Sequence, residues 1–313
     1  MKVGIIGAGN IAQKAYFPTY ASLQDQHEFV IYSRDLAKAR ALQTQYGFSG
    51  AVTDLQRLYD ADLVFIHAAT QAHFTLAKDF LTHGVPVFMD KPISEHLSET
   101  QALLALAKEK KLLFISGFNR RFAPRVSELK TLSDKSLITV TKNRVNADLP
   151  LTYELYDLFI HPLDTLFFLL DDLADVAELS DNVQVVAKTD AAGQLQQIVV
   201  VIETPKTIGI AKLNAKSGAN TETITVETPS ATHTLRGLTD EEIETATSTV
   251  QVSFSDWDTT LYKRGFESMV KQTLDEVAGF EASHRKASMQ NLKQENVLKS
   301  HELIDIILKK INK

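Results

Sequence analysis

The chain has 313 residues, of which 44% are hydrophobic and 23% are charged. This length and composition are typical of a globular protein with two domains. The formal net charge of -6 leaves no excess of positive charge to neutralise a phosphate backbone, so nucleic acid is not an expected partner. Cysteine is absent, which excludes disulfides, thiolate nucleophiles and cysteine-ligated metal sites.

The apolar stretches are too short or too interrupted to predict a targeting or membrane segment. Residues 3–6 form an apolar run, but a signal peptide needs about 7 to 15 apolar residues. Residues 155–170 are more apolar, yet Asp157, His161, Pro162 and Asp164 interrupt them, and a membrane span needs about 20 apolar residues. We therefore expect a cytoplasmic protein without a membrane anchor.

Residues 1–120 alternate short apolar runs with helical patterns. Continuous apolar runs are typical of parallel strands buried on both faces, and helix formers with apolar residues three and four positions apart lie between them. The predicted strands are residues 3–6, 29–32, 63–67, 85–89 and 112–116. The predicted helices are residues 36–46, 72–83 and 99–110. This order predicts an α/β domain with an open, doubly wound parallel sheet.

Residues 121–313 have a different pattern, in which several strands alternate apolar with polar residues. The predicted strands are residues 137–145, 183–188, 196–203, 207–214, 221–227 and 232–235. The predicted helices are residues 152–170, 259–278 and 289–311. Alternation of this kind favours a largely antiparallel, open sheet with one wet face, so the second domain is predicted to be α+β.

A glycine-rich turn follows the first predicted strand and opens a helix. Its residues, Gly7-Ala8-Gly9-Asn10-Ile11-Ala12, match the G-x-G-x-x-G/A pattern of a Rossmann dinucleotide-binding fold in the context that the pattern requires. Gly7 permits a tight turn, and Gly9 lets the backbone approach a pyrophosphate. Amides at the start of the helix then point toward that anion. We therefore expect residues 1–120 to bind a dinucleotide.

The end of the second predicted strand bears on which coenzyme is bound. NAD enzymes usually place an acidic residue there for the ribose 2′-hydroxyl, whereas this chain has Ser33 and Arg34. A guanidinium suits a 2′-phosphate, so NADP is predicted, with NAD left possible because Asp35 is adjacent. The alternative is that Ser33 or Asp35 only caps the next helix.

Two further motifs carry groups suited to proton transfer. Asp90-Lys91-Pro92 follows a predicted strand directly, which places Lys91 at the carboxyl edge of the sheet, where open α/β folds bind ligands. Asp157 and His161 are four residues apart, so a helix would present them on one face. Pro162 either kinks this helix or marks its restart. Taken singly, such a lysine is usually a surface residue and such a histidine usually belongs to the core.

Together these motifs resemble the glucose-fructose oxidoreductase, inositol dehydrogenase and MocA-like family over essentially the whole chain. The resemblance includes Thr70-x-x-His73 and the run 117–122, Gly-Phe-Asn-Arg-Arg-Phe. Family members typically have Thr-Pro where this chain has Ala68-Ala69, and Glu where it has Asp90. By this resemblance, the coenzyme contacts outside the glycine turn and the second strand are Ala68, Ala69, Thr70, His73, Asp90, Lys91, Asn119 and Arg120.

The resemblance implies hydride transfer between nicotinamide C4 and a secondary alcohol or carbonyl carbon of a sugar, an inositol or a related small molecule. A general acid or base must then move the hydroxyl proton. We assign His161 as the principal proton relay, Lys91 as the partner of the substrate oxygen and Asp157 as the residue that orients them. The roles of Lys91 and His161 are interchangeable at this point. No metal is expected, because hydride transfer needs none.

The expected division of labour follows the two domains. Residues 1–120 would bind NAD(P), and residues 121–313 would bind substrate and form a homodimer or homotetramer through their sheet. The main alternative is a regulator or sensor that binds NADP without catalysis, since a fold can keep its coenzyme and lose its chemistry.

Overall fold

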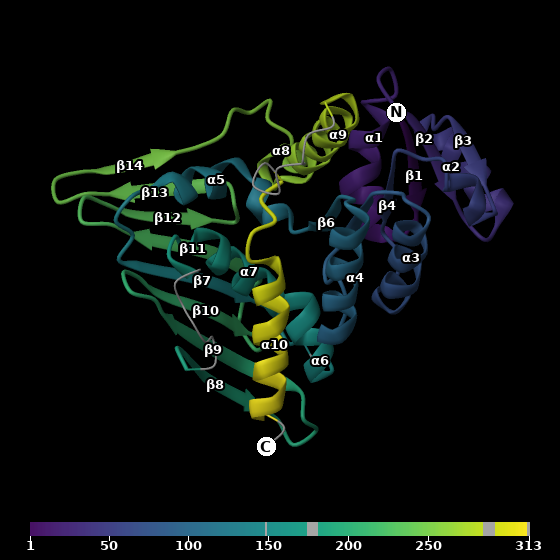
Figure 1. Cartoon of the computed structure of the whole chain (residues 1–313). Coiled ribbons are helices and arrows are strands. Elements are labelled where there is room, and N and C mark those ends of the chain that lie inside the picture. Colours follow the sequence, from purple (N-terminus) through teal and green to yellow (C-terminus); the bar gives the residue numbers. More distant parts are fainter. Residues whose placement is uncertain (148, 174–180, 284–291, 312–313) are drawn as a thin grey trace. The chain divides into compact units, whose positions relative to one another are not determined.

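The computed structural model describes residues 1–147, 149–173, 181–283 and 292–311. The chain divides into two compact units (Figure 1). The first unit comprises Met1–Gly117 and Phe266–Gln294, and the second comprises Phe118–Gly265 and Glu295–Lys313. The first unit therefore includes a C-terminal segment as well as the N-terminal part of the chain. In the described ranges, no helix is long and apolar enough to cross a membrane.

The first unit contains a six-stranded parallel sheet in the order β3-β2-β1-β4-β5-β6. Its strands are β1 (Lys2–Ile6), β2 (Glu28–Tyr32), β3 (Gly50–Val52), β4 (Leu63–Ile66), β5 (Val87–Asp90) and β6 (Phe114–Gly117). The predicted Rossmann-type sheet is thereby confirmed. The strand β3 was not predicted, because three half-buried residues at the edge of a sheet give too short an apolar run.

The helices of this unit connect strands and cover the sheet. They are η1 (Ala12–Tyr16), α1 (Phe17–Ala21), α2 (Leu36–Tyr46), η2 (Leu55–Leu58), α3 (Thr70–Thr82), α4 (Leu97–Lys110) and α9 (Phe266–Ser283). Figure 1 shows α3 and α4 side by side, and the two pack against each other. The direction of the strand order reverses between β1 and β4. Because the loops after these two strands lead to opposite faces of the sheet, their carboxyl ends leave a crevice.

The second unit contains an eight-stranded sheet in the order β14-β13-β12-β11-β7-β10-β9-β8. Its strands are β7 (Leu137–Asn143), β8 (Val183–Thr189), β9 (Leu195–Glu203), β10 (Ile208–Asn214), β11 (Thr221–Glu227), β12 (Thr232–Arg236), β13 (Asp240–Glu244) and β14 (Thr249–Val252). All neighbours are antiparallel except β7 and β10. The predicted, largely antiparallel sheet is confirmed. β13 and β14 were missed because their residues are mostly polar or exposed.

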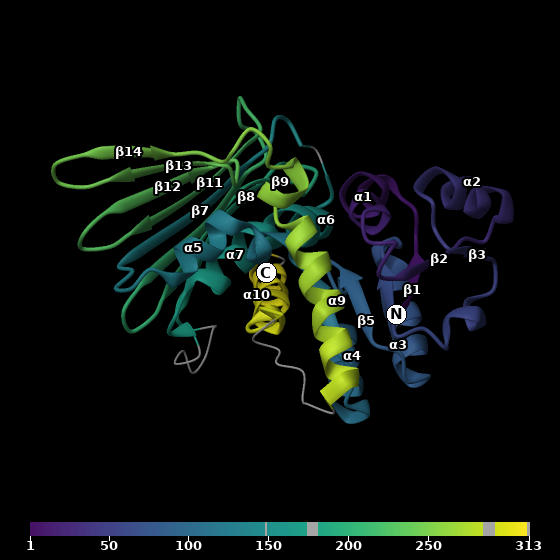
Figure 2. The same cartoon turned by 90° about the horizontal axis from the view of Figure 1, so that it is seen from above.

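Helices cover one face of this second sheet. They are η3 (Asn119–Phe122), α5 (Pro124–Thr131), α6 (Leu151–Tyr153), η4 (Glu154–Phe159), α7 (Ile160–Leu169), α8 (Thr260–Lys263) and α10 (Val297–Ile311). The helix α7 packs on β7 and β10, and α10 packs on α7. Figure 2 shows α5, α7 and α10 on the same side of the sheet. Ile138 and Val140 face these helices and are buried, whereas the residues that alternate with them in β7 are half-buried.

Three predicted helices of the second half differ from the structure. The stretch 152–170 consists of α6, the π-helix η4 and α7. The stretch 259–278 is broken at Gly265, whose φ of 82° is unfavourable for other residues and whose added Cβ would lie 2.2 Å from the Asn119 carbonyl oxygen. The last helix begins at Val297 rather than at residue 289, and residues 289–291 lie outside the described residues.

Candidate functional site

The glycine turn after β1 has the backbone that its sequence predicts. Gly7 has a φ of 97°, and a Cβ at this position would lie 2.5 Å from the carbonyl carbon of His67. A side chain at Gly7 is therefore excluded by both conformation and packing. Gly9 is different, because a Cβ there would meet no atom within 4 Å. Its backbone is open, as close approach of a ligand requires.

An open pocket of about 620 Å³ lies at the carboxyl ends of β1, β2 and β4. Seven predicted coenzyme contacts line it: Gly7, Ala8, Gly9, Ser33, Arg34, Ala68 and Ala69. The other lining residues, which were not predicted as contacts, are Ile6, Tyr32, Lys38, His67, Ala72, Thr75 and Leu76. The predicted contacts Asn10, Ile11, Thr70, His73, Asp90 and Lys91 are not lining residues of this pocket. The structure thus brings together the glycine turn and the end of β2.

The end of β2 contributes positive charge to this pocket. Arg34 and Lys38 both line it. The carboxylate of Asp35 instead caps α2, where it accepts hydrogen bonds from the backbone nitrogens of Ala37 (2.8 Å) and Lys38 (3.2 Å). The Ser33 hydroxyl accepts a hydrogen bond from the backbone nitrogen of Asp35. The capping alternative therefore holds for Asp35, which leaves the two cations as the charged lining residues of the described pocket.

A buried hydrogen-bond network fixes Asp90, the residue before Lys91. His67 Nδ1 lies 2.8 Å from Asp90 Oδ2, and His67 Nε2 lies 2.8 Å from the Tyr20 hydroxyl. The hydroxyl of Tyr16 donates to Asp90 Oδ1. Burial by itself would raise the pKa of Asp90, but His67 and Tyr16 outweigh it and hold this pKa below its usual value. Asp90 is thus an ionised, fully engaged carboxylate.

The two tyrosines of this network keep their protons. Burial, followed by the nearby charge of Asp90, raises the pKa of Tyr16 and of Tyr20 well above the usual value. The Tyr20 hydroxyl can therefore donate to His67 Nε2 while Nδ1 donates to Asp90. Sequence reasoning missed Tyr16, Tyr20 and His67, since no spacing rule links them to Asp90.

Lys91 lies immediately after β5 and is half-buried. The Lys91–Pro92 peptide bond is cis. His73 ties this loop to the loop after β4, because its Nδ1 lies 2.9 Å from the Pro92 carbonyl oxygen and its Nε2 lies 3.1 Å from that of Ala68. Burial lowers the pKa of His73. The contacts of His73 in this unit are therefore those of a residue that braces two loops.

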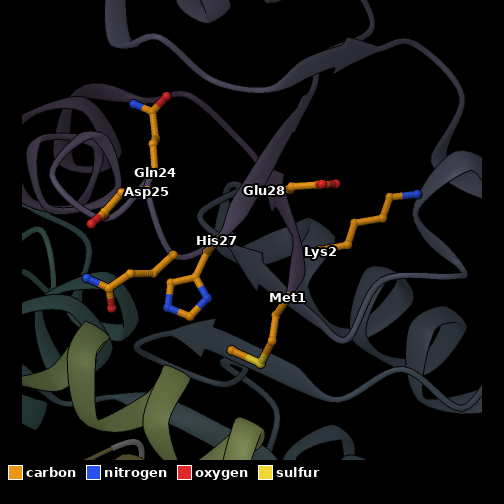
Figure 3. A pocket seen from close by; sticks show the side chains of 7 residues that line it. Met1, Lys2, Gln24, Asp25, His27 and Glu28 are labelled. Carbon is orange, nitrogen blue, oxygen red and sulfur yellow. The ribbon is translucent and has the colours of Figure 1, made fainter.

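A second hollow of the first unit lies at the opposite edge of the sheet. It has a volume of about 420 Å³ and is lined by Met1, Lys2 and residues 24–28 at the amino ends of β1 and β2 (Figure 3). Ligands of open α/β sheets bind at the carboxyl ends of the strands. We therefore do not assign this hollow to the coenzyme.

In the second unit, His161 belongs to a buried polar cluster. Arg120 NH1 lies 2.7 Å from His161 Nδ1. The same guanidinium binds both carboxylate oxygens of Glu222, through Nε to Oε1 and through NH2 to Oε2 at 2.9 Å. Glu222 lies on the same face of β11 as Ile224 and Val226, which are buried. Burial by itself would raise the pKa of Glu222, but Arg120 outweighs it and lowers this pKa to about 2.

The residue predicted to orient His161 was Asp157, which lies in η4, whereas His161 lies in α7. The partner at Nδ1 is Arg120, which the resemblance had suggested as a coenzyme contact. Pro162 stands in the first turn of α7, which continues from the π-helix η4 without a break, so the residue that lacks an N–H lies where the type of helix changes. The sequence thus selected His161, Asp157 and Arg120, but missed Glu222.

Neighbouring residues hold this cluster in place. Asn119 Nδ2 donates to the Arg264 carbonyl oxygen at 2.8 Å, and Asn119 Oδ1 accepts from Arg120 NH1 at 3.2 Å. Arg121 forms a separate, fully buried pair with Asp164, in which Nε and NH2 bind the two carboxylate oxygens at 2.8 and 2.7 Å. The two arginines of the Asn-Arg-Arg run therefore form ion pairs with two different carboxylates.

Comparison with known proteins identifies the class of protein that this fold and site define. Residues 1–118 match the model of an oxidoreductase family with an NAD-binding Rossmann fold. Over 293 residues, the chain is 27% identical to the putative oxidoreductase YceM of Salmonella typhimurium. The alignment covers 90% of this chain and 94% of that protein. Over 133 residues, the chain is 26% identical to the scyllo-inositol 2-dehydrogenase (NADP(+)) IolU of Bacillus subtilis. This alignment covers 42% of this chain and 40% of that protein.

The solved structures agree with this class. A crystal structure of a Gfo/Idh/MocA family oxidoreductase from Vibrio cholerae superposes with a TM-score of 0.87 at 28% identity, over 100% of both chains. Over residues 1–118 the chain thus matches the model of this oxidoreductase family, and over its whole length it is similar to a Gfo/Idh/MocA family oxidoreductase.

Proposed function

We propose that this chain is an NADP-dependent dehydrogenase that acts on a secondary alcohol or the corresponding carbonyl of a sugar, an inositol or a related small polyol. The observation that carries the proposal is the pocket in which the open backbone of Gly9 and the cations Arg34 and Lys38 meet. The match of residues 1–118 to an oxidoreductase family, and the similarity to an inositol dehydrogenase, support the reaction class.

The lining of the pocket fits a coenzyme with an extra phosphate. The turn 7–9 offers backbone amides, and at Gly9 no side chain stands in the way, which suits a pyrophosphate. Arg34 and Lys38 suit a 2′-phosphate, since a guanidinium binds phosphate through a planar fork and an ammonium adds a point charge. Asp35, the residue that could have favoured a 2′-hydroxyl, is engaged as a helix cap. These contacts favour NADP over NAD.

Lys91 and His161 are the groups proposed to handle the substrate hydroxyl, with Asp157 as an orienting residue. A bound nicotinamide coenzyme would supply or accept the hydride at C4. The chain must therefore hold the substrate oxygen and move its proton, which is the work of a general acid or base. Asp90, ionised and held on both oxygens by Tyr16 and His67, fixes the backbone from which Lys91 projects.

The wider setting of the enzyme follows from the same proposal. We place it in the cytoplasm, as a homodimer or homotetramer formed through the face of the second sheet opposite α7. Val199, Val201 and Ile210 are half-buried residues of that face. Light scattering would test this assembly, and a monomer at micromolar concentration would contradict the proposed homodimer or homotetramer.

Coenzyme binding is tested by fluorescence titration with NADPH and NADH. Arg34→Gln and Lys38→Gln should each weaken NADPH binding by about 10- to 100-fold, because a hydrogen bond to a charged group contributes about 1.5–3 kcal/mol. NADH binding should change little. Lys108→Gln, which alters an exposed lysine on α4, is the matched control and should leave both affinities unchanged. Equal losses for NADPH and NADH would contradict the assignment of the 2′-phosphate.

Catalysis is tested with a panel of inositols, sugars and keto-sugars, by following NADPH absorbance. Lys91→Ala should lower turnover by orders of magnitude and leave NADPH affinity within a few fold. Retained turnover would remove Lys91 from the mechanism. Tight NADPH binding without turnover on any member of the panel would favour a non-catalytic sensor.

A further inference from the structure

Three arginines of the second unit lie near the carboxylate of Glu222. Arg120 binds both oxygens of this carboxylate. Arg264 lies close enough for the charges of Arg120 and Glu222 to act on it. The charge of Arg144 acts on Arg264 as well. A carboxylate that is already paired with one guanidinium thus has two more guanidiniums beside it.

The main chain brings Arg264 and Arg144 together. Arg264 ends α8, and its carbonyl oxygen accepts a hydrogen bond from Asn119 Nδ2 at 2.8 Å. The next residue, Gly265, packs so tightly on η3 that a Cβ there would collide with the backbone. Arg144 directly follows β7, which lies between β10 and β11 (Figure 1). Its backbone nitrogen donates to the Asn214 carbonyl oxygen at 2.8 Å. The two guanidiniums therefore approach from two anchored segments.

Neither of these two arginines has a carboxylate of its own. In the ranges that the structure describes, the side chain of Arg264 forms no hydrogen bond and no ion pair. The side chain of Arg144 donates to the Asn143 carbonyl oxygen at 3.3 Å and likewise forms no ion pair with a described residue. Both arginines are half-buried. Partly buried charges are screened less than exposed ones, so two such neighbours favour a bound anion.

The electrostatics of Arg264 agree with this arrangement. Burial, followed by repulsion from Arg120, lowers the pKa of Arg264. The charge of Glu222 acts in the opposite direction, and Arg144 adds to the repulsion. The local field at Arg264 is therefore positive even with Glu222 ionised, which is the field that an anionic ligand requires.

We propose that Arg264 and Arg144 form a binding site for an anionic group of the substrate, either a phosphate monoester or a carboxylate. A guanidinium offers parallel N–H donors that match two oxygens of either group. The site is close to His161, because His161 Nδ1 lies 2.7 Å from NH1 of Arg120, whose charge acts on Arg264. This inference rests on the proposed dehydrogenase function and narrows its substrate class to an acidic or phosphorylated sugar or polyol.

A neutral polyol would leave this site unsatisfied. Its hydroxyl groups can accept hydrogen bonds, but they carry no charge and leave the repulsion between Arg264 and Arg144 in place. A carboxylate or a phosphate removes this repulsion and accepts charge-assisted hydrogen bonds, which are about twice as strong as neutral ones. One such hydrogen bond corresponds to about a 10- to 100-fold preference for the anionic compound.

Matched pairs of compounds test the substrate class. Turnover with NADP is compared between myo-inositol and myo-inositol 1-phosphate, and between glucose and either glucose 6-phosphate or glucuronate. For at least one pair, kcat/KM of the anionic member should exceed that of the neutral member by about 10- to 100-fold. A phosphorylated or a carboxylated winner identifies the anionic group. Equal or higher kcat/KM for every neutral member would overturn the inference and leave the dehydrogenase function standing.

Calorimetric titration with inorganic phosphate measures the site without turnover. Saturating NADPH is present, so that phosphate does not occupy the pocket beside Arg34. Arg264→Gln and Arg144→Gln should each weaken phosphate binding by about 10- to 100-fold. The matched control is Arg236→Gln, which alters an exposed arginine of β12 and should leave the affinity unchanged. Unchanged affinity in both site variants, with their folds confirmed by circular dichroism, would overturn the site.

Two further outcomes separate the substrate from the coenzyme and the site from the function. The site variants should keep NADPH affinity within a few fold, and their preference for the anionic compound should fall by about 10- to 100-fold. A loss of NADPH affinity as large as the loss of phosphate affinity would overturn the assignment to the substrate. If phosphate binding depends on Arg264 and Arg144 but no compound is turned over, the proposed function fails while the anion site stands.

Discussion

The buried imidazole of His301 should make the second unit less stable in mild acid. His301 lies in α10 and is 0% exposed. Its Nδ1 donates to the Val297 carbonyl oxygen at 3.1 Å, and the rings of Phe118 and Tyr156 lie 6.2 and 6.3 Å away. Burial lowers the pKa of His301 from 6.5 to about 4, although the Val297 carbonyl and the Asp164 charge act in the opposite direction.

The magnitude follows from the two pKa values. Between pH 6.5 and about pH 4, the unfolded chain takes up a proton at His301 that the folded chain does not, so the free energy of unfolding falls as the pH falls. A pKa difference of about 2.5 corresponds to about 3 kcal/mol when the lower limit is reached, and to about 2 kcal/mol near pH 5. This is a large share of the stability of a typical domain.

The assay is urea unfolding of the wild type and of His301→Gln, monitored by circular dichroism at about pH 7.5 and about pH 5. Other titrating groups contribute equally to both chains, so the difference between the two pH dependences isolates His301. The wild type should lose about 2 kcal/mol more than the variant. His83→Gln, which replaces a histidine whose side chain is 45% exposed, should follow the wild type. Parallel losses in the wild type and His301→Gln would refute the reasoning.

Three further predictions concern the glycine turn, the cap of α2 and the buried ion pair. Gly9→Ala should fold normally and bind NADPH at least about tenfold more weakly, as a titration would show. Gly7→Ala should lose about 1–3 kcal/mol or more of stability in thermal unfolding, because its φ is positive and its Cβ would collide with the His67 backbone. Asp35→Ala should lower the free energy of unfolding by about 1 kcal/mol, since it removes the cap of α2; an unchanged melting temperature would contradict this. Glu222→Gln should lower the free energy of unfolding by about 3 kcal/mol at neutral pH. This difference between the wild type and the variant should become smaller as the pH falls from 4.5 toward about 2, because the wild-type carboxylate then also takes up a proton. A gap that stays constant in acid would show that the ionised form of Glu222 is not the source of stability.

The sequence by itself determined the features that depend on neighbouring residues. The parallel sheet followed from continuous apolar runs, and the glycine turn followed from the residues between β1 and its helix, because backbone conformation and burial pattern are local. The short strand β3 and the polar strands β13 and β14 were not predicted from the sequence, since their residues give no apolar period of sufficient length.

Only the tertiary structure decided which side chains share a proton or a charge. Tyr16 reaches Asp90 across 74 positions of sequence, Tyr20 reaches His67 across 47, and Arg120 reaches Glu222 across 102. These partners are set by the order of strands and by which face of a strand or helix a side chain occupies, and no spacing rule encodes such pairings. His161 could be selected from its place beside Asp157, but its hydrogen-bonding state depends on a guanidinium from η3 that β11 holds in place.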